Sequence, residues 1–404
     1  MSAITYINLP ATFLEDNLWV YPLGVLNMVA YTKSLGHQAH FLDLAPLGNY
    51  CSTREELEQE IRKVVSEIDT EWIGVSAVTP QYDLLKMIPE FTTRKLIAGG
   101  VHPSLYPDEV MLMGYSAVVS GAGEGSIEQI LSSRVNRHSP VHFLGRLGII
   151  PIDDLPFPDR TLVQHYRGPA PVMAGRGCPF RCTFCAQVAG KYVMRSPERV
   201  AEELAQIDSK DVIFYDDTLT ASPSWLTRLH DCIKAAGINK CFRCSTRADK
   251  ITDRVAETLA SMGFQEVCIG VESGSQKILD ALNKRTTPAQ NADAIRILKR
   301  HGLSVKAFIM VGSPGESDET MGETYDWITE NQPDKIGLYI FRPLPGCDIY
   351  EHPERYDIKF EKYDFSGMFY GGHREEMEAH VSTSALSRNA ITTWYRTFLT
   401  TFST

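Results

Sequence analysis

The sequence predicts an α/β protein with two parallel-sheet domains, and three observations support this. Short apolar runs alternate with amphipathic helical stretches from residue 4 to about residue 131, and the alternation resumes at residue 172. Alternating strands and helices are typical of parallel sheets. The stretch 136–168 between the two series is irregular and rich in proline. We expect a first domain at 1–135, a linker at 136–170, a second domain at 171–346 and a C-terminal segment at 347–404.

The composition is that of an ordinary globular protein, with 43% hydrophobic and 22% charged residues and a net charge of −10. No run of Lys and Arg is longer than a pair, which argues against a nucleic-acid partner. The nine cysteines have no even framework spacing, which indicates a reducing cytoplasm. The N-terminus has no basic region, and Pro22 interrupts the longest apolar stretch, so we expect neither a signal peptide nor a membrane span.

The first domain is predicted to be a doubly wound sheet of the flavodoxin or Rossmann type, which binds its ligand at the carboxyl ends of its strands. Glycines follow the fourth and fifth predicted strands, where the backbone either approaches a ligand or makes an ordinary turn. The expected strands are 4–9, 39–44, 73–78, 95–98 and 117–119, and the expected helices are 23–34, 54–68, 82–90, 107–112 and 126–131.

The second series contains six strand–helix units and predicts a (β/α)6 partial barrel, an incomplete relative of the TIM barrel. Its site should lie at the carboxyl ends of the strands. One of its helices should begin with Ser196 as N-cap and Pro197 in the first turn. The expected strands are 172–175, 212–216, 242–246, 266–271, 305–311 and 335–341.

Three cysteines follow the first strand of this barrel with the spacing C-x3-C-x2-C: Cys178, Cys182 and Cys185. Thiolates this close can reach one metal centre. A structural zinc site and an electron-transfer cubane each normally use four protein ligands. Three thiolates leave one iron of a [4Fe–4S] cluster open to a ligand that is not protein. The alternative is a zinc knuckle with a remote fourth ligand.

With Phe184 before its last cysteine, this run resembles the signature of the radical S-adenosylmethionine (SAM) superfamily. In that family the open iron is chelated by the amino and carboxylate groups of SAM. An electron from the cluster then cleaves SAM to a 5′-deoxyadenosyl radical. The resemblance implies that the three cysteines are the catalytic metal ligands, with Phe184 in contact with the cofactors.

The resemblance also implies SAM contacts at later strand ends. Asp216 and Asp217 would face the methionyl amine, or else they cap a helix. Glu272, next to Ser273, would hold the ribose hydroxyls, or else it is a solvated acid. Arg247 would pair with the SAM carboxylate or the substrate, or else form a structural salt bridge. The segment with Gly312, Pro314 and Gly315 would contact adenine.

In the third strand of the barrel, Arg243, Ser245 and Arg247 share one face. Cys241 and Cys244, three apart, point to opposite faces, which favours core thiols over a second metal site.

Segments of the first domain, 21–24, 99–103 and 121–125, resemble the N-terminal domain of cobalamin-binding radical SAM enzymes. Where other cobalamin domains carry D-x-H-x-x-G, this chain has Asp43, then Ala45 in place of the histidine, then Gly48. The resemblance therefore implies base-off cobalamin without a histidine ligand. His102 would contact the nucleotide tail or is a plain turn residue. The implied contacts are Ser76, Gly99, Gly100, Val101, His102, Gly121, Gly123 and Glu124.

A degenerate first domain, kept for packing or for partner contact, is the alternative to cobalamin binding. The C-terminal segment carries aromatic residues and a helical stretch at 385–398. These either roof the barrel mouth or form a docking helix and loop. The aromatic residues are Tyr356, Tyr363, Phe365, Phe369 and Tyr370.

The resemblance implies a cobalamin-dependent radical SAM enzyme of the class B methyltransferase type. Such an enzyme transfers a methyl group from methylcobalamin to a substrate carbon radical generated by the 5′-deoxyadenosyl radical. The alternatives are a ring rearrangement or cyclisation of a small natural-product precursor, and a non-catalytic iron–sulfur protein that binds SAM. The expected partners are a small-molecule or peptide substrate and a reductant such as flavodoxin or ferredoxin.

Overall fold

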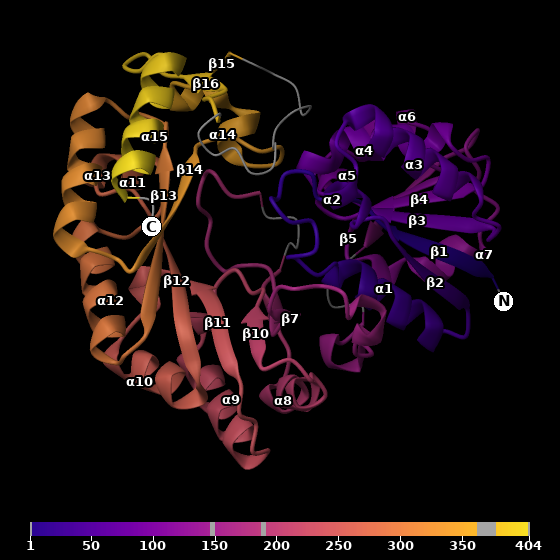
Figure 1. Ribbon diagram of the computed structural model, residues 1–404, viewed down its shortest axis with the longest axis horizontal. Coiled ribbons are helices and arrows are strands. Elements are labelled where there is room, and N and C mark those ends of the chain that lie inside the picture. The colour runs from indigo at the N-terminus through magenta and orange to yellow at the C-terminus, as the bar shows by residue number, and fades with distance from the viewer. Residues whose placement is uncertain (1, 146–149, 187–190, 362–376, 403–404) are drawn as a thin grey trace. The chain divides into compact units, whose positions relative to one another are not determined.

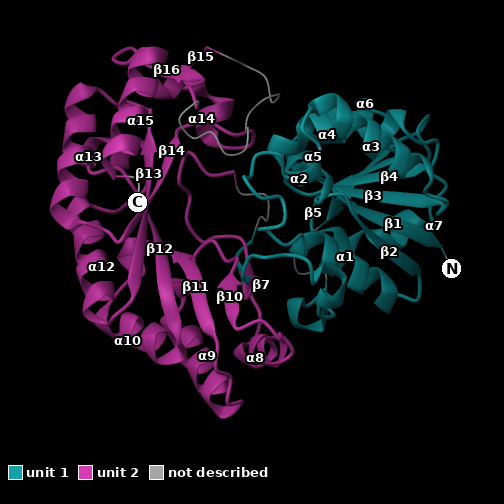
Figure 2. Cartoon of the chain, viewed as in Figure 1, with its two compact units in different colours: residues 1–169, 188–193, 364–372 teal, residues 170–187, 194–363, 373–404 magenta. Residues whose placement is uncertain are grey.

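The computed structural model describes residues 2–145, 150–186, 191–361 and 377–402. The chain divides into two compact units (Figure 2). The first is formed chiefly by residues 1–169, and the second by residues 170–187, 194–363 and 373–404. Each unit contains one six-stranded parallel sheet, which confirms the predicted fold class.

The sheet of the first unit has the strand order β2-β1-β3-β4-β5-β6 (Figure 1). In such an order the ligand crevice lies at the carboxyl ends of β1 and β3, where the direction of winding reverses. Helices cover both faces, and each face has its own apolar core, one containing Ile7 and Val75 and the other Ile4 and Trp72. The strands are β1 Ala3–Asn8, β2 Gln38–Asp43, β3 Trp72–Ser76, β4 Lys95–Gly99, β5 Ala117–Gly121 and β6 Val141–Gly145.

The helices of this unit begin close to where the sequence predicts them. Thr53 caps α3 through a capping box with Glu56, which fixes its first turn. Residues 101–105, which we expected only as a turn, form the short helix α5. The helices are α1 Leu23–Ser34, α2 Leu47–Tyr50, α3 Arg54–Ser66, α4 Tyr82–Met87, α5 Val101–Leu105, α6 Pro107–Leu112 and α7 Ile127–Ser132.

The stretch that we expected to be an irregular linker contains a sixth strand. β6 pairs in parallel with β5, from Val141 beside Ala117 to Gly145 beside Gly121. Only Phe143 of this strand is buried, so the sequence lacks the continuous apolar run that marks the other strands. Further along, Tyr166 packs against Leu18 and other buried residues of the first unit.

The second unit has the strand order β14-β13-β12-β11-β10-β7, all parallel, as expected for a partial barrel. Its strands alternate in burial. In β13, Val305, Ala307 and Ile309 are fully buried under the helices, while Lys306 and Phe308 on the other face are half-buried. The strands are β7 Ala170–Val172, β10 Asp211–Phe214, β11 Cys241–Thr246, β12 Phe264–Glu272, β13 Ser304–Val311 and β14 Lys335–Ile340.

Helices line the outer side of this sheet (Figure 1). Several begin with a hydroxyl cap, and Ser196 caps α8 through the backbone N–H of Arg199, as predicted. The short strands are β8 Gly175–Arg176, β9 Val193–Met194, β15 Lys359–Phe360 and β16 Val381–Ser382. The helices are α8 Pro197–Ala205, α9 Pro223–Ala235, α10 Asp253–Met262, α11 Gln276–Ala281, α12 Pro288–Arg300, α13 Asp318–Asn331, α14 Asp348–Glu351 and α15 Arg388–Phe402.

The C-terminal helix α15 docks on the barrel. Tyr395 and Phe398 are fully buried in the core of the second unit, and the indole N–H of Trp394 donates to Asp318 at 2.7 Å. Of our two alternatives for this helix, the contacts favour the docking helix. The hydroxyl of Tyr356 donates to the Asp348 carboxylate. Tyr363, Phe365, Phe369 and Tyr370 lie outside the described residues.

Candidate functional site

The loop that carries the three cysteines follows β7 and is fixed by hydrogen bonds with the end of α11 and the residues after it. The backbone N–H of Thr183 donates to the carbonyl of Leu282 at 3.1 Å, and its hydroxyl donates to the carbonyl of Ala281 at 3.2 Å. The Asn283 amide donates to the carbonyl of Arg181 at 2.7 Å. The loop is therefore held in place by the segment after α11, at the carboxyl end of the barrel, where the sequence predicted the site.

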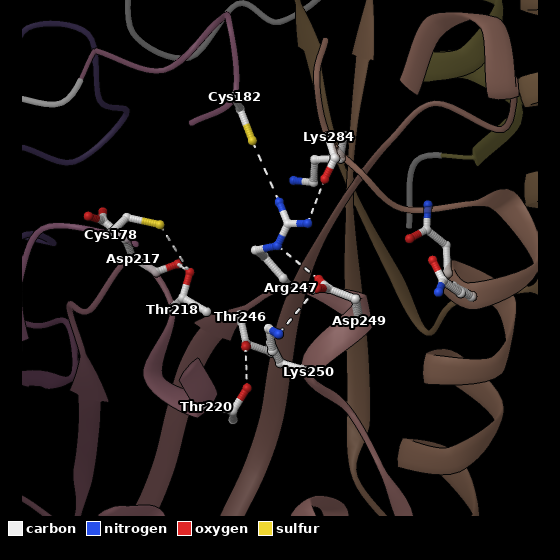
Figure 3. Close-up of polar contacts among 12 residues, drawn as sticks. Cys178, Cys182, Asp217, Thr218, Thr220, Thr246, Arg247, Asp249, Lys250 and Lys284 are labelled. Atoms are coloured by element: carbon white, nitrogen blue, oxygen red, sulfur yellow. Dashed lines mark hydrogen bonds and ion pairs between the residues drawn. The ribbon is translucent and has the colours of Figure 1, made fainter. Parts of the chain in front are cut away.

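Within the described residues, hydrogen-bond contacts reach the sulfur atoms of Cys178 and Cys182 (Figure 3). The Sγ of Cys178 lies 3.6 Å from the hydroxyl of Thr218, and an Arg247 N–H donates to the Sγ of Cys182 at 3.6 Å. Burial raises the pKa of the Cys182 thiol, while the cations of Lys284 and Arg247 act in the opposite direction. A metal ion replaces the thiol proton, so assembly of a cluster here would release protons.

The donor set suits three irons of an iron–sulfur cluster, and thiolates also suit zinc. Three soft thiolates come from one fixed loop. Among the residues that the structure describes, no group of three or more His, Cys, Asp or Glu side chains stands ready to hold a metal ion. The same holds for the three cysteines themselves, so this observation favours neither the cluster nor the zinc knuckle.

The two aspartates after β10 have different surroundings. Asp216 is 6% exposed, and its carboxylate accepts the backbone N–H of Ala174 at 2.9 Å, at the start of the cysteine loop. Burial raises the pKa of Asp216 to about 7. Asp217 is exposed, and its backbone carbonyl accepts the hydroxyl of Thr218 at 2.8 Å (Figure 3). The following 3₁₀ turn has no side-chain cap, so the helix-cap alternative is wrong.

Glu272, at the end of β12, is paired with a lysine that the sequence analysis missed. Its carboxylate lies 2.6 Å from the Nζ of Lys284, and the two side chains are 9% and 6% exposed. The solvated-acid alternative is therefore wrong. A Cβ atom at Gly270 would lie 2.4 Å from Glu272 Oε1 and 2.7 Å from Lys284 Nζ, which explains the glycine. The Lys284 ammonium also lies 5.7 Å from the centre of the Phe184 ring.

The backbone around this ion pair is strained. Five non-glycine residues of the described chain have positive φ, and three of them lie here: Glu272 at 66°, Asn283 at 48° and Arg285 at 56°. The register of β12 against β13 also shifts between Gly270 and Glu272, and such bulges re-aim side chains beside functional sites. Strained residues of this kind persist where the surrounding structure holds them, and they cluster at ligand sites.

Arg247 follows β11 and is 5% exposed. Its Nε donates to Asp249 at 2.8 Å, and its Nη2 donates to the carbonyl of Lys284 at 2.5 Å. The salt bridge that we gave as one alternative is present. No sequence signal places Lys284 beside Arg247, because they lie 37 positions apart on different loops.

Ser273 and the loop after β13 are organised by internal contacts. Ser273 is fully buried, and its hydroxyl lies 2.9 Å from that of Thr324. Glu316, which ends the segment expected to contact adenine, accepts the backbone N–H groups of Gly312 and Ser313. Burial raises the pKa of Glu316 to about 8.

Gly312 has a φ of 93°, and a Cβ atom on it would lie 2.7 Å from Ile391 of α15. Pro314 is buried, and Gly315 has a φ of 77°. This turn therefore follows the end of β13, where adenine contacts were expected, and it packs against the docked helix.

In the first unit, most of the glycines at the carboxyl ends of the strands lie so close to other backbone or side-chain atoms that a Cβ atom would collide with them. A Cβ atom on Gly100 would lie 2.7 Å from the Ala77 carbonyl oxygen and 2.8 Å from the Ser76 hydroxyl. On Gly121 it would lie 2.3 Å from the Gly145 carbonyl oxygen. Gly99 has no atom within 4 Å of such a position. Gly99 is therefore where this edge leaves room for another molecule.

His102 is fully buried between two tyrosine rings, with ring centres 5.2 Å away for Tyr82 and 5.7 Å for Tyr106. These surroundings favour our alternative that His102 is a plain turn residue and not a contact to the nucleotide tail. Glu124 is 8% exposed, and a Cβ atom on Gly123 would lie 2.8 Å from the Met28 sulfur.

The place of the missing motif histidine holds a network centred on Asp43. Its carboxylate accepts the amide of Asn8 at 2.8 Å and the backbone N–H of Ala45 at 3.1 Å. It also lies 2.8 Å from Nε2 of His165. The sequence analysis missed His165, because it lies 122 positions from Asp43.

The radical SAM superfamily model matches residues 172–328. An uncharacterized methyltransferase of Pyrococcus horikoshii is 26% identical over 82% of this chain and 78% of its own length. The anaerobic magnesium-protoporphyrin IX monomethyl ester cyclase of Rubrivivax gelatinosus is 25% identical over 85% of this chain and 68% of its own length. The bacteriochlorophyllide d C-12(1)-methyltransferase of Chlorobaculum tepidum is 25% identical over 67% of this chain and 62% of its own length.

Two solved structures share the fold. The radical SAM methyltransferase TsrM of Kitasatospora setae, with cobalamin and a [4Fe–4S] cluster bound, matches with a TM-score of 0.70 and 16% identity over 90% of this chain and 78% of its own. The cobalamin-dependent radical SAM enzyme OxsB, with aqua-cobalamin bound, matches with a TM-score of 0.69 and 18% identity over 87% and 55%. No described helix of this chain has the length and apolarity needed to cross a membrane.

Proposed function

We propose that this chain, whose residues 172–328 match the radical SAM superfamily, is a cobalamin-dependent methyltransferase that acts on a carbon atom of its substrate. One observation carries the proposal. A fixed loop with three thiols follows the first strand of a six-stranded parallel half-barrel, and a separate doubly wound unit precedes that barrel. When bound, a [4Fe–4S] cluster with SAM supplies a 5′-deoxyadenosyl radical, and cobalamin supplies the methyl group.

In this proposal the residues of the barrel hold and orient the cofactors. Cys178, Cys182 and Cys185 would ligate three irons. Glu272 would hold the ribose hydroxyls, because an ionised carboxylate accepts two hydrogen bonds. Lys284 supports that role, because its buried ammonium lies 2.6 Å from the Glu272 carboxylate and holds it in place.

The first unit would hold cobalamin through backbone and apolar contacts. Gly99 leaves space after β4. Val101, the next residue but one, is 38% exposed, and Trp19 and Val20 in the loop after β1 are 50% and 41% exposed. Exposed apolar side chains at the ligand-binding edge of such a sheet suit a large, partly apolar ligand.

Cyclisation is the second candidate reaction, because the cyclase of Rubrivivax gelatinosus matches this chain over a similar share of its length. Both reactions would use a small-molecule or peptide substrate and an external one-electron reductant of the flavodoxin or ferredoxin type. They differ in the fate of SAM, because methyl transfer converts a second SAM to S-adenosylhomocysteine.

The test is an anaerobic assay of the reconstituted protein with iron, sulfide, hydroxocobalamin, SAM and dithionite, in which both nucleoside products are quantified. We expect 5′-deoxyadenosine and S-adenosylhomocysteine together. Formation of 5′-deoxyadenosine alone would favour cyclisation or another rearrangement. Cys182→Ala is the negative control, and Cys241→Ala, which removes a thiol outside the loop, is its matched control.

A further inference from the structure

The Arg247 guanidinium lies beside one of the three thiols and has little freedom to move. Its Nη1 donates to the Cys182 sulfur at 3.6 Å (Figure 3), and the side chain is 6% exposed. A carboxylate, a carbonyl and an aromatic ring hold the group from three other directions.

These contacts fix both the plane and the orientation of the guanidinium. Asp249 accepts from Nε at 2.8 Å, and the carbonyl of Lys284 accepts from Nη2 at 2.5 Å. The guanidinium carbon lies 4.0 Å from the centre of the Phe180 ring, which is part of the cysteine loop itself. A planar cation held at this many points has already lost its side-chain entropy, so its contact with sulfur adds little ordering cost.

Among the described residues, the other hydrogen-bond contact to a sulfur of the three loop cysteines is neutral. The hydroxyl of Thr218 lies 3.6 Å from Cys178. Lys250 also lies near the loop, with its ammonium 5.3 Å from the Phe180 ring and 3.5 Å from Asp249. No contact of Lys250 with a cysteine is among the hydrogen bonds and ion pairs of the described residues. Arg247 therefore brings a positive charge directly to a sulfur.

We propose that Arg247 is a positioning residue that orients Cys182 and raises the reduction potential of the iron–sulfur cluster bound by that cysteine. The inference rests on the proposed function, because it requires the cluster. Reduction adds one electron from an external reductant to the cluster, with no bond or proton changing place. A hydrogen bond from a cation to a ligand sulfur stabilises the added negative charge, and such bonds are among the factors that set cluster potentials.

This role differs from the SAM-carboxylate or substrate contact that the sequence suggested. The three N–H groups with assigned partners point to Asp249, to the Lys284 carbonyl and to Cys182. Each of these partners belongs to the barrel unit. Arg247 is thereby held between the cysteine loop, the turn after β11 and the segment after α11.

The test is a potentiometric titration of the reconstituted protein followed by electron paramagnetic resonance, without SAM or substrate, so that it does not depend on activity. In Arg247→Gln, we expect the ratio of reduced to oxidised cluster at the wild-type midpoint to fall about tenfold, as for loss of a hydrogen bond to a charged group. The matched control Lys250→Gln removes another cation that lies near the Phe180 ring, and it should change that ratio less than threefold.

Arg247→Lys separates charge from hydrogen bonding, because lysine lacks the planar fork. Its potential should lie between those of the wild type and Arg247→Gln. If Arg247→Gln fails to bind iron, Arg247→Lys carries the test, and a wild-type potential there would overturn the proposal. A wild-type potential in iron-loaded Arg247→Gln would do the same. If the wild type itself binds no cluster, the proposed function fails, whereas a normal wild type with an unaffected Arg247→Gln refutes only the role of Arg247.

Discussion

The carboxyl edges of the two parallel sheets are built differently. The barrel edge is dense with buried charge, and Glu272, Lys284 and Arg247 are all less than 10% exposed. The edge of the first unit has an open position at Gly99 and exposed apolar side chains at Trp19 and Val101. The contrast indicates two kinds of ligand. Fixed charges suit a small charged group that must be held in one geometry, whereas open backbone and apolar contacts suit a large ligand.

The largest expected effect concerns the barrel edge, where removal of one proposed cluster ligand should abolish iron binding and SAM cleavage. Cys182→Ala leaves two thiols, so we expect loss of bound iron and no 5′-deoxyadenosine above background. Iron analysis and quantification of the nucleoside check this, with Cys241→Ala as control. A variant that still cleaves SAM would show that the loop does not hold the catalytic cluster.

Breaking the buried Glu272–Lys284 ion pair tests whether the stability of the barrel edge depends on paired charges. Lys284→Met leaves the Glu272 carboxylate buried without its cation, and loss of one partner of a buried pair typically costs about 3–5 kcal/mol. Denaturant unfolding of the metal-free protein should show that loss. The exposed Lys277→Met is the matched control. In the double variant Lys284→Met/Glu272→Gln, we expect part of the stability to return; equal instability of the double and single variants would argue against the pair.

The pH dependence of stability should report on Glu316. Its pKa is raised by burial from 4.5 to about 8, so the folded state binds more protons than the unfolded state between these values. Stability from this group therefore falls as pH rises from about 4.5 to about 8, by at most about 1.4 kcal/mol per pH unit. Glu316→Gln keeps an acceptor oxygen and should flatten this slope in denaturant unfolding. Exposed Glu319→Gln should retain the slope, and parallel curves for Glu316→Gln and wild type would refute the assignment.

Filling the open position at Gly99 should have the smallest effect, and it tests whether the first unit binds a corrinoid there. A leucine at Gly99 would occupy the space after β4 and should weaken hydroxocobalamin binding by about tenfold, as for loss of roughly 1.4 kcal/mol. Equilibrium dialysis measures this. Gly322→Leu, at another position with no atom within 4 Å but in the barrel unit, should bind like the wild type. Unchanged corrinoid binding in Gly99→Leu would place the ligand elsewhere.

The sequence predicted what local pattern determines and missed what distant pairing determines. α1 and α6 begin and end at the predicted residues, because their apolar spacing and proline signals are local. β6 was missed because only Phe143 in it is buried. The roles of the cysteine loop and of Glu272 were predicted from short motifs and stay predictions. Lys284 and His165 were missed because nothing in their own neighbourhood points to their partners Glu272 and Asp43.

The most direct test of the central claim is the cofactor content of the anaerobically reconstituted chain after unbound iron and corrinoid are removed. We predict close to four irons, four sulfides and one corrinoid per chain. A full iron content without corrinoid would contradict the role proposed for the first unit. Corrinoid or zinc without a [4Fe–4S] cluster would contradict the role proposed for Cys178, Cys182 and Cys185.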